Sequence, residues 1–214
     1  MKTSLSQAIV NMKFDEIEAL VQKALVAGKS PLRILDELRS GLDIVGKKFE
    51  KQEYFLSDLY MAAETMKRAL DVLRPHFKKG EIKSKGRIVI GSMEGDIHDF
   101  GKNIVISLLL SHGLEVYDLG IDVSPAKFVS EAIRVNADII GVSALLSATQ
   151  PKTKELIDEL NSRGIRNRFK VILGGAGVQK EAVEWWGVDA AVNDGVKGVD
   201  IIKSWVEEKK NAKK

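Results

Sequence analysis

Residues 87–103 read RIVIGSMEGDIHDFGKN and combine an apolar run with a polar turn. The apolar, β-branched segment at 87–91 is typical of a strand that is covered on both faces. A glycine-flanked turn follows, in which His98 lies between Asp96 and Asp99, and a helix is expected from about Gly101. A strand, a turn and a helix in this order predict the first unit of an α/β fold, with charged side chains at the carboxyl end of its strand.

The same alternation continues to the end of the chain. Further strands are expected at 114–118, 138–143, 170–174 and 189–193, and helices at 101–112, 125–136, 151–163, 179–186 and 196–209. Five strands that are each followed by a helix predict a flavodoxin-like (Rossmann-like) five-stranded parallel sheet in the order 2-1-3-4-5. Ligands of such sheets bind beyond the carboxyl ends of the first and third strands, so the turn at His98 and the loop from Ser143 to Thr149 should meet there.

The first part of the chain has a different period. Apolar residues at helical spacing predict helices at 14–27, 31–41 and 42–52, and a last one from Ser57, its N-cap, to Pro75. Four short helices predict a small all-α bundle. The lysine- and glycine-rich segment that follows predicts a solvated linker. The expected domains are therefore a helical bundle at 1–76, a linker at 77–86 and an α/β domain at 87–214.

The composition excludes several classes of protein. The chain has 214 residues, a net charge of +3 and no cysteine, so disulfides, iron–sulfur clusters and cysteine zinc sites are excluded. The small charge is scattered, and no nucleic-acid partner is expected. Neither a leader nor an apolar run near the roughly 18 residues of a membrane span is found, which predicts a cytoplasmic protein without a membrane partner.

Several roles are open to His98. In the simplest one it is a surface residue, and Asp99 caps the next helix. A metal site built from protein ligands needs a second histidine, but His112 lies about 16 Å from Gly101 along that helix and His76 lies in the other half. A serine hydrolase would lack the glycine-flanked elbow around Ser143. A receiver domain would lack its acceptor aspartate, and a dinucleotide site would lack its glycine fingerprint.

One further role needs only a single histidine. A metal that is already coordinated by a macrocycle takes one axial nitrogen from the protein. Such a histidine is normally oriented by a carboxylate on its other ring nitrogen. Asp96, two residues before His98, has the right chemistry and spacing for that task.

Three motifs together resemble the cobalamin-binding signature: Asp96-x-His98-x-x-Gly101, Ser143-x-Leu145 and Gly174-Gly175. Residues 49–66 are similar to the helical cap of corrinoid methyl carriers and methionine synthase. The whole chain resembles the stand-alone corrinoid proteins of methylotrophic methanogens and acetogens. Ser57 departs from this pattern, since relatives are expected to have proline there.

The resemblance implies a bound cobalamin in the base-off state, with His98 as the lower axial ligand of cobalt and the only metal ligand from the protein. Asp96 would accept a hydrogen bond from His98, and Thr149 would hold Asp96 in a proton relay. The nucleotide tail would enter a slot lined by glycines that permit close approach. Residues implied to contact the cofactor are Gly95, Asp96, Ile97, His98, Asp99, Phe100, Gly101, Ser143, Leu145, Ser147, Thr149, Gly174 and Gly175, with Phe55, Met61 or Met66 covering the upper face or forming bundle core.

The implied function is that of a methyl carrier, with methylcobalamin as the loaded cofactor. Its implied partners are a substrate-specific methyltransferase, a second methyltransferase that uses coenzyme M or tetrahydrofolate, and a reductive activation protein. The methyl donor (methanol, a methylamine, a betaine or a methoxylated aromatic) is set by the first partner. The chain is then an enzyme component rather than a complete enzyme. Two alternatives are a cobalamin-dependent sensor, which normally adds an output module, and the small subunit of an adenosylcobalamin mutase, which lacks the helical cap.

Overall fold

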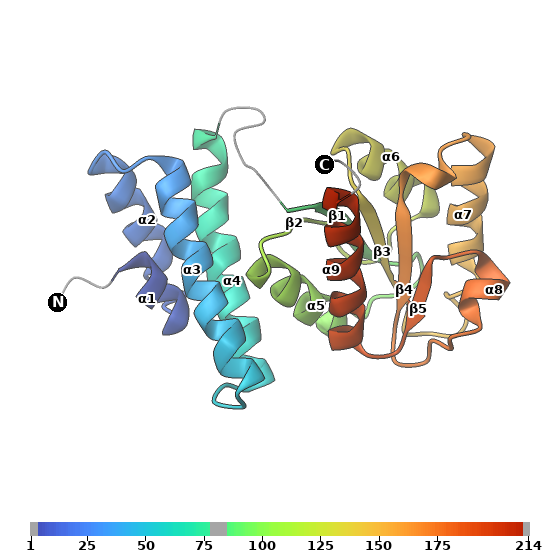
Figure 1. The fold of residues 1–214 in the computed structure, drawn as a ribbon, viewed down its shortest axis with the longest axis horizontal. Helices are drawn as coiled ribbons and strands as arrows, with labels where there is room; N and C mark the ends of the chain where they lie inside the picture. The colour runs from blue at the N-terminus through green and yellow to red at the C-terminus, as the bar shows by residue number, and fades with distance from the viewer. Residues whose placement is uncertain (1–3, 78–84, 212–214) are drawn as a thin grey trace. The chain divides into compact units, whose positions relative to one another are not determined.

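A computed structural model describes residues 4–77 and 85–211 of the chain. It divides into two compact units, one helical and one α/β (Figure 1). The helical unit contains α1 (Leu5–Val10), α2 (Ile17–Val26), α3 (Pro31–Glu50) and α4 (Leu56–Leu73). Most of the expected linker, residues 77–86, lies outside the described residues.

The expected helix break at Gly41 is wrong, because α3 runs through it as one helix. A Cβ atom at this position would lie 2.7 Å from the Ser6 carbonyl oxygen and 2.8 Å from the Ile9 Cβ. Glycine therefore permits α1 to pack directly against α3, instead of ending the helix. Helix α1 was not predicted from the sequence, because its six residues are too few for a clear helical period.

The cap of the last helix in this unit also differs from the expectation. α4 begins at Leu56, so Ser57 lies inside the helix. The Asp58 carboxylate instead accepts a hydrogen bond from the Phe55 backbone N–H at 2.7 Å. Inside the unit, apolar side chains of all four helices are buried, as expected for a bundle: Ile9, Ile17, Val21, Ile34, Leu38, Leu42, Leu59 and Leu73.

The α/β unit confirms the predicted fold class. All five strands are parallel, in the order β2-β1-β3-β4-β5. The strands are β1 (Arg87–Ser92), β2 (Glu115–Asp118), β3 (Ile139–Ser143), β4 (Lys170–Gly174) and β5 (Ala190–Val192). The helices are α5 (Phe100–Ser111), α6 (Pro125–Arg134), α7 (Lys152–Ser162), α8 (Ala182–Trp186) and α9 (Gly195–Asn211). The expected helix at 179–186 is shorter than predicted, because α8 begins at Ala182.

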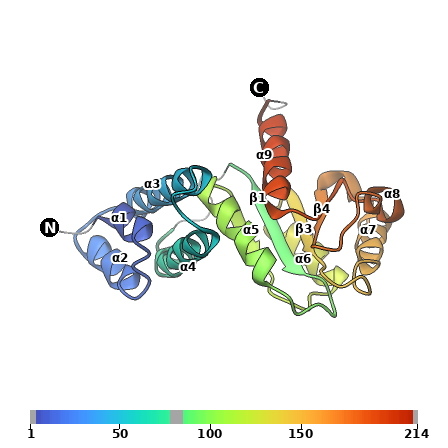
Figure 2. The same ribbon diagram turned by 90° about the horizontal axis from the view of Figure 1, so that it is seen from below.

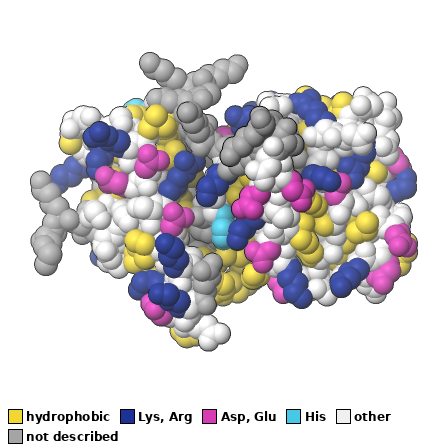
Figure 3. All heavy atoms as spheres, viewed as in Figure 1, with side chains coloured by type: hydrophobic (Ala, Val, Ile, Leu, Met, Phe, Trp, Pro, Cys, Tyr) yellow, Lys and Arg dark blue, Asp and Glu magenta, His cyan; other side chains and the backbone are white. Residues whose placement is uncertain are grey.

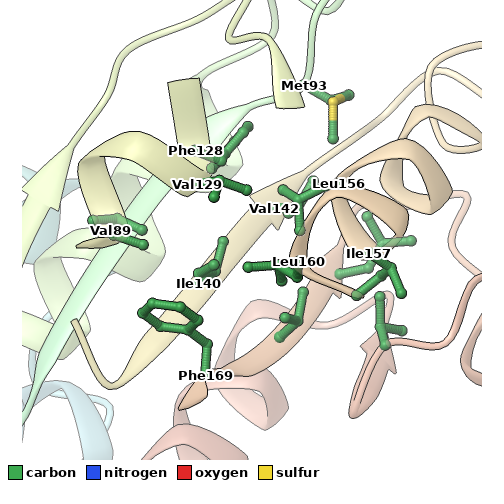
Figure 4. Packing of buried hydrophobic residues seen from close by; sticks show 14 of the residues in the cluster. Val89, Met93, Phe128, Val129, Ile140, Val142, Leu156, Ile157, Leu160 and Phe169 are labelled. Atoms are coloured by element: carbon green, nitrogen blue, oxygen red, sulfur yellow. The ribbon is translucent and has the colours of Figure 1, made fainter. Parts of the chain in front are cut away.

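The two faces of the sheet are covered by different helices. Figure 2 shows α7 and α8 on the side of the sheet away from α5 and α9. On the α6–α7 side, Phe128, Leu156 and Leu160 pack against the strand residues Ile140 and Val142 in a continuous buried core (Figure 4). This side of the sheet is closely packed, whereas the cavity described below lies on the other side.

The face of the molecule in Figure 3 shows no large area of one charge. Lysine and arginine side chains are interspersed with aspartate and glutamate over the face seen in Figure 3. Within the described ranges, no helix has the length and apolar character needed to cross a membrane.

Candidate functional site at the carboxyl edge of the sheet

The turn after β1 is hydrogen-bonded to the loops of both neighbouring strands. On the β2 side, the Ser92 N–H donates to the Gly120 carbonyl at 2.9 Å, and the Glu94 N–H donates to the Val123 carbonyl at 2.9 Å. On the β3 side, the Met93 N–H donates to the Ser143 carbonyl at 2.8 Å. The backbone that leads to His98 is therefore held from two directions before the turn begins.

Asp96 and His98 form the central pair of the turn. The His98 Nδ1 atom lies 2.8 Å from Asp96 Oδ1, and the His98 backbone N–H donates to the same oxygen at 3.0 Å. The Asp96 side chain is 1% exposed, whereas the His98 side chain is 51% exposed. With the Nδ1 proton directed at the carboxylate, the Nε2 atom keeps its lone pair for a partner outside the turn.

The second oxygen of Asp96 is held mainly by the backbone of the loop after β3. The Leu145 N–H donates to Oδ2 at 2.6 Å and the Leu146 N–H at 3.2 Å. The Thr149 hydroxyl lies 3.4 Å from Oδ2, but only 2.9 Å from the Leu146 carbonyl oxygen. A hydroxyl has a single hydrogen, so the shorter contact to Leu146 takes most of it. Thr149 therefore lies close to Asp96, but the two backbone amides are nearer to Oδ2 than the hydroxyl is.

These hydrogen bonds decide the charge of Asp96. Burial by itself raises the pKa of a carboxyl group, since it disfavours the charged form. Here the hydrogen bonds from the His98 backbone and ring, and from the Leu146 and Leu145 amides, outweigh burial and lower the pKa of Asp96 below its usual value. The buried group is therefore a carboxylate at neutral pH, and its charge faces the imidazole.

Asp122, in the loop after β2, is a site residue that the sequence analysis missed. Its Oδ1 atom accepts from the Gly95 N–H at 2.7 Å, and its own N–H donates to the Asp96 carbonyl at 3.2 Å. Both Gly95 and Asp122 have positive φ, +86° and +54° respectively. The signal in the sequence was an aspartate in the loop after a neighbouring strand, at the same edge of the sheet as His98.

A cavity of about 260 Å³ opens beside His98. It runs from the carboxyl edge of the sheet into the space between the sheet and the helices α5 and α9. Six of the sequence-predicted site residues line it together: His98, Gly101, Ser143, Leu145, Gly174 and Gly175. The contribution of α9, through Gly195, Gly198 and Ile202, was not anticipated.

The other sequence-predicted residues lie outside the cavity lining. Ile97 and Phe100 are 71% and 65% exposed beside His98. Asp99 directly precedes α5, and its carboxylate accepts from the Asn103 side chain at 3.2 Å. Ser147 is exposed in the loop after β3. In the helical unit, Phe55 is 73% exposed, Met66 is 2% exposed and Met61 is partly buried.

The residues present fit a cofactor that brings its own metal. In the described part of the chain, no group of three or more acidic or histidine side chains could hold a bare metal ion. A side chain at Gly175 would put its Cβ 2.3 Å from the Ala144 carbonyl oxygen, so only glycine fits there. The cavity wall at this point is therefore formed by backbone atoms. The fold and the site together define a binding protein with one oriented imidazole beside a glycine-lined cavity.

Comparisons with known proteins identify the family. Residues 86–199 match a B12 binding domain, and residues 1–74 match a second family model that is also described as a B12 binding domain. A corrinoid protein of Desulfitobacterium hafniense is 44% identical over 178 residues, which cover 80% of this chain and 81% of that protein. Dimethylamine corrinoid protein 2 of Methanosarcina acetivorans is 42% identical and covers 80% of each chain.

A solved structure supports the same assignment. The methanol:cobalamin methyltransferase complex of Methanosarcina barkeri contains a chain that matches with a TM-score of 0.82 and 27% identity, over 95% of this chain and 78% of that one. The protein belongs to the corrinoid proteins of methyltransferase systems, and its cofactor is a corrinoid.

Proposed function

We propose that the protein carries a methyl group on the cobalt of a base-off corrinoid, with His98 Nε2 as the lower axial ligand. The observation that carries the proposal is the Asp96–His98 pair, with its Nδ1–Oδ1 distance of 2.8 Å, at the mouth of the cavity. The carrier would work between a substrate-specific methyltransferase and a second methyltransferase that uses coenzyme M or tetrahydrofolate. A reductive activation protein would restore the cofactor when it is oxidised.

The turn supplies the ligand and fixes its orientation. When bound, the corrinoid supplies a cobalt centre that accepts and releases a methyl group. Asp96 lies at hydrogen-bond distance from Nδ1 of His98, which favours the tautomer that leaves the Nε2 lone pair free for a ligand. The cavity beside His98 would receive the nucleotide tail, whose own base is displaced from cobalt by the imidazole.

Asp96 also prepares the imidazole for the state in which Nε2 has no metal partner. The half-exposed ring is still held through Nδ1 by the buried carboxylate, so its orientation does not depend on a metal at Nε2. The Leu145 and Leu146 amides keep the carboxylate in place in both states. The helical unit at 1–76, with the exposed Phe55, would serve as the cap of the cofactor.

Methyl transfer by the loaded protein tests the proposal. Wild type, His98→Ala and His76→Ala are each loaded with cobalamin, reduced and methylated with methyl iodide. They are then mixed with a corrinoid-dependent methyltransferase and with coenzyme M or tetrahydrofolate. His76 is an exposed histidine of the helical unit, so its variant controls for the loss of an imidazole.

We expect wild type and His76→Ala to transfer methyl groups faster than free methylcobalamin, and His98→Ala to lose a large part of that advantage. The proposal fails if the folded wild type does not retain cobalamin on washing. It also fails if the loaded wild type transfers no faster than the free cofactor with every methyltransferase tried.

A further inference from the structure

The cavity has a polar mouth and an apolar inner end. Ser143 ends β3 and Asn193 follows β5 at the carboxyl edge, and both line the cavity with His98. Farther in, Ile90, Gly141 and Ile172 form one row across β1, β3 and β4, since Ile90 pairs with Gly141 and Gly141 pairs with Ile172. Because residues in one row of a parallel sheet point to the same face, these three form the floor of the inner end.

Two helices close this inner end from above. Val105 contributes from α5, and Gly198 and Ile202 contribute from one side of α9. A Cβ atom on Gly198 would lie 3.3 Å from Val192 Cγ2 and 3.9 Å from Ile172 Cδ1, so the absence of a side chain keeps the space open. The side chains that the structure describes at the inner end are aliphatic and have no hydrogen-bond donor or acceptor: Ile90, Val105, Ile172 and Ile202.

The charged groups that line the cavity already have partners. Lys102 Nζ donates to Asp118 Oδ1 at 2.7 Å and to Asn103 Oδ1 at 3.0 Å. Asp194 Oδ1 accepts from the Val196 N–H at 2.8 Å. A ligand that reaches the inner end would therefore find aliphatic contact there, and polar contact only near the mouth.

We infer that this cavity selects corrinoids whose nucleotide tail ends in a benzimidazole-type base over those that end in a purine. The inference rests on the proposed function, in which the tail enters the cavity. Corrinoids differ in this base, and a purine has more ring nitrogens and, in adenine, an amino group. Burying such polar groups without hydrogen-bond partners weakens binding, whereas a benzimidazole presents a largely hydrocarbon edge.

The size of the cavity agrees with a site for one part of a larger ligand. Its volume of about 260 Å³ lies just below the roughly 300 Å³ at which sites for whole small molecules begin. A hydrophobic pocket discriminates against an added polar group by about 100-fold at most. A preference of about 10- to 100-fold between the two classes of base is therefore expected.

Equilibrium binding of three corrinoids tests the inference without any assay of methyl transfer. The apo protein is titrated with cobalamin, with its analogue that carries adenine in place of dimethylbenzimidazole, and with cobinamide, which has no nucleotide. Binding is followed by the absorbance of the corrinoid. We expect cobalamin to bind most tightly, the adenine analogue to bind about 10- to 100-fold more weakly, and cobinamide to bind more weakly than cobalamin.

A variant whose new side chain fills the cavity provides an independent test. In Gly198→Leu, the new side chain should occupy the inner end, so that the advantage of cobalamin over cobinamide disappears. Leucine favours a helix more than glycine does, so the variant should fold, and circular dichroism checks this. Ser204→Leu, on an exposed position of α9, is the matched control and should keep the wild-type order of affinities.

Two outcomes overturn the inference and leave the proposed function intact: equal affinity for cobalamin and the adenine analogue, or equal affinity for cobalamin and cobinamide. Failure of the folded wild type to bind any of the three corrinoids would overturn the proposed function as well.

Discussion

Two aspartates at opposite edges of the sheet hold their charges in different ways. Asp189, at the amino end of β5, is 20% exposed and pairs with Arg166 at 2.8 Å and Lys170 at 3.2 Å. Asp96, at the carboxyl edge, is 1% exposed and forms no ion pair with lysine or arginine among the described residues. Its partners are backbone amides, a hydroxyl and the His98 ring.

The different surroundings of the two carboxylates indicate a structural role for Asp189 and a functional role for Asp96. The cations around Asp189 neutralise its charge, and the Val171 N–H donates to it at 2.8 Å, so this group fastens β4 to β5. The dipoles around Asp96 hold the carboxylate without neutralising it, which leaves its charge to act on an imidazole. Substitution of Asp189 should therefore change stability, whereas substitution of Asp96 should change cofactor binding.

Asp189→Ala should have the largest effect on stability. The substitution removes two ion pairs and leaves Arg166, which is 19% exposed, without its carboxylate. We expect a loss of about 3 kcal/mol in the free energy of unfolding, measured by urea denaturation of the apo protein. The spectrum of bound cobalamin should be unchanged, and a changed spectrum would mean that the two edges of the sheet are not independent.

Asp96→Asn should have the largest effect on the cofactor. The amide keeps the shape of the side chain but removes the charge that orients and polarises the His98 ring. Loss of such a carboxylate partner typically weakens metal binding by about 10- to 100-fold. Titration with cobalamin measures the affinity, and Asp158→Asn, which changes an exposed carboxylate on α7, is the control. Equal affinities in both variants would contradict the assigned role of Asp96.

Asp122→Ala should have a smaller effect in the same direction. It removes the hydrogen bond to Gly95 and puts alanine at a backbone position with positive φ. We expect cobalamin affinity to fall by up to about tenfold, which corresponds to roughly 1.4 kcal/mol. Asp122→Asn should restore most of it, because asparagine tolerates this conformation and keeps an acceptor oxygen. If asparagine does not rescue binding, Asp122 acts by its charge rather than by its geometry.

Thr149→Val should have the smallest effect on binding. The hydroxyl lies closer to the Leu146 carbonyl than to Asp96, and the Leu145 and Leu146 amides are nearer to the carboxylate. The affinity for cobalamin should change by less than about twofold, which lies within 0.5 kcal/mol. A loss as large as that of Asp96→Asn would show that the hydroxyl is the main support of the carboxylate.

The sequence predicted the α/β fold well because its strands and helices have clear periods. Buried runs such as 87–91 and the alternation with amphipathic helices led directly to the strand order that the structure has. The helical unit was predicted less well. Gly41 reads as a helix end, and only its contact with Ser6 and Ile9 shows that it permits close packing of α1.

The candidate site was predicted in its motifs but only in part in the residues that support them. Ser143 and Gly174 were placed at the candidate site because they end predicted strands, and His98 because it lies in the turn after one; all three match a known pattern. Asp122 was not found, since its role depends on one hydrogen bond to Gly95 across 27 residues of sequence. Gly198 was not found either, because a glycine in a helix gives no sign that it borders a cavity.

The identity of the axial ligand decides between this interpretation and a merely structural His98. Electron paramagnetic resonance of the cobalt(II) form reports the ligand, because a coordinated nitrogen splits the cobalt lines. Ordinary ¹⁴N gives triplets, whereas ¹⁵N gives doublets. The protein is therefore labelled with ¹⁵N-histidine and loaded with unlabelled cobalamin.

We expect doublets in the labelled wild type and in labelled His76→Ala, and loss of the doublets in labelled His98→Ala. Triplets in the labelled wild type would mean that the nitrogen on cobalt comes from the cofactor's own base. That result would contradict the assignment of His98 as the lower ligand.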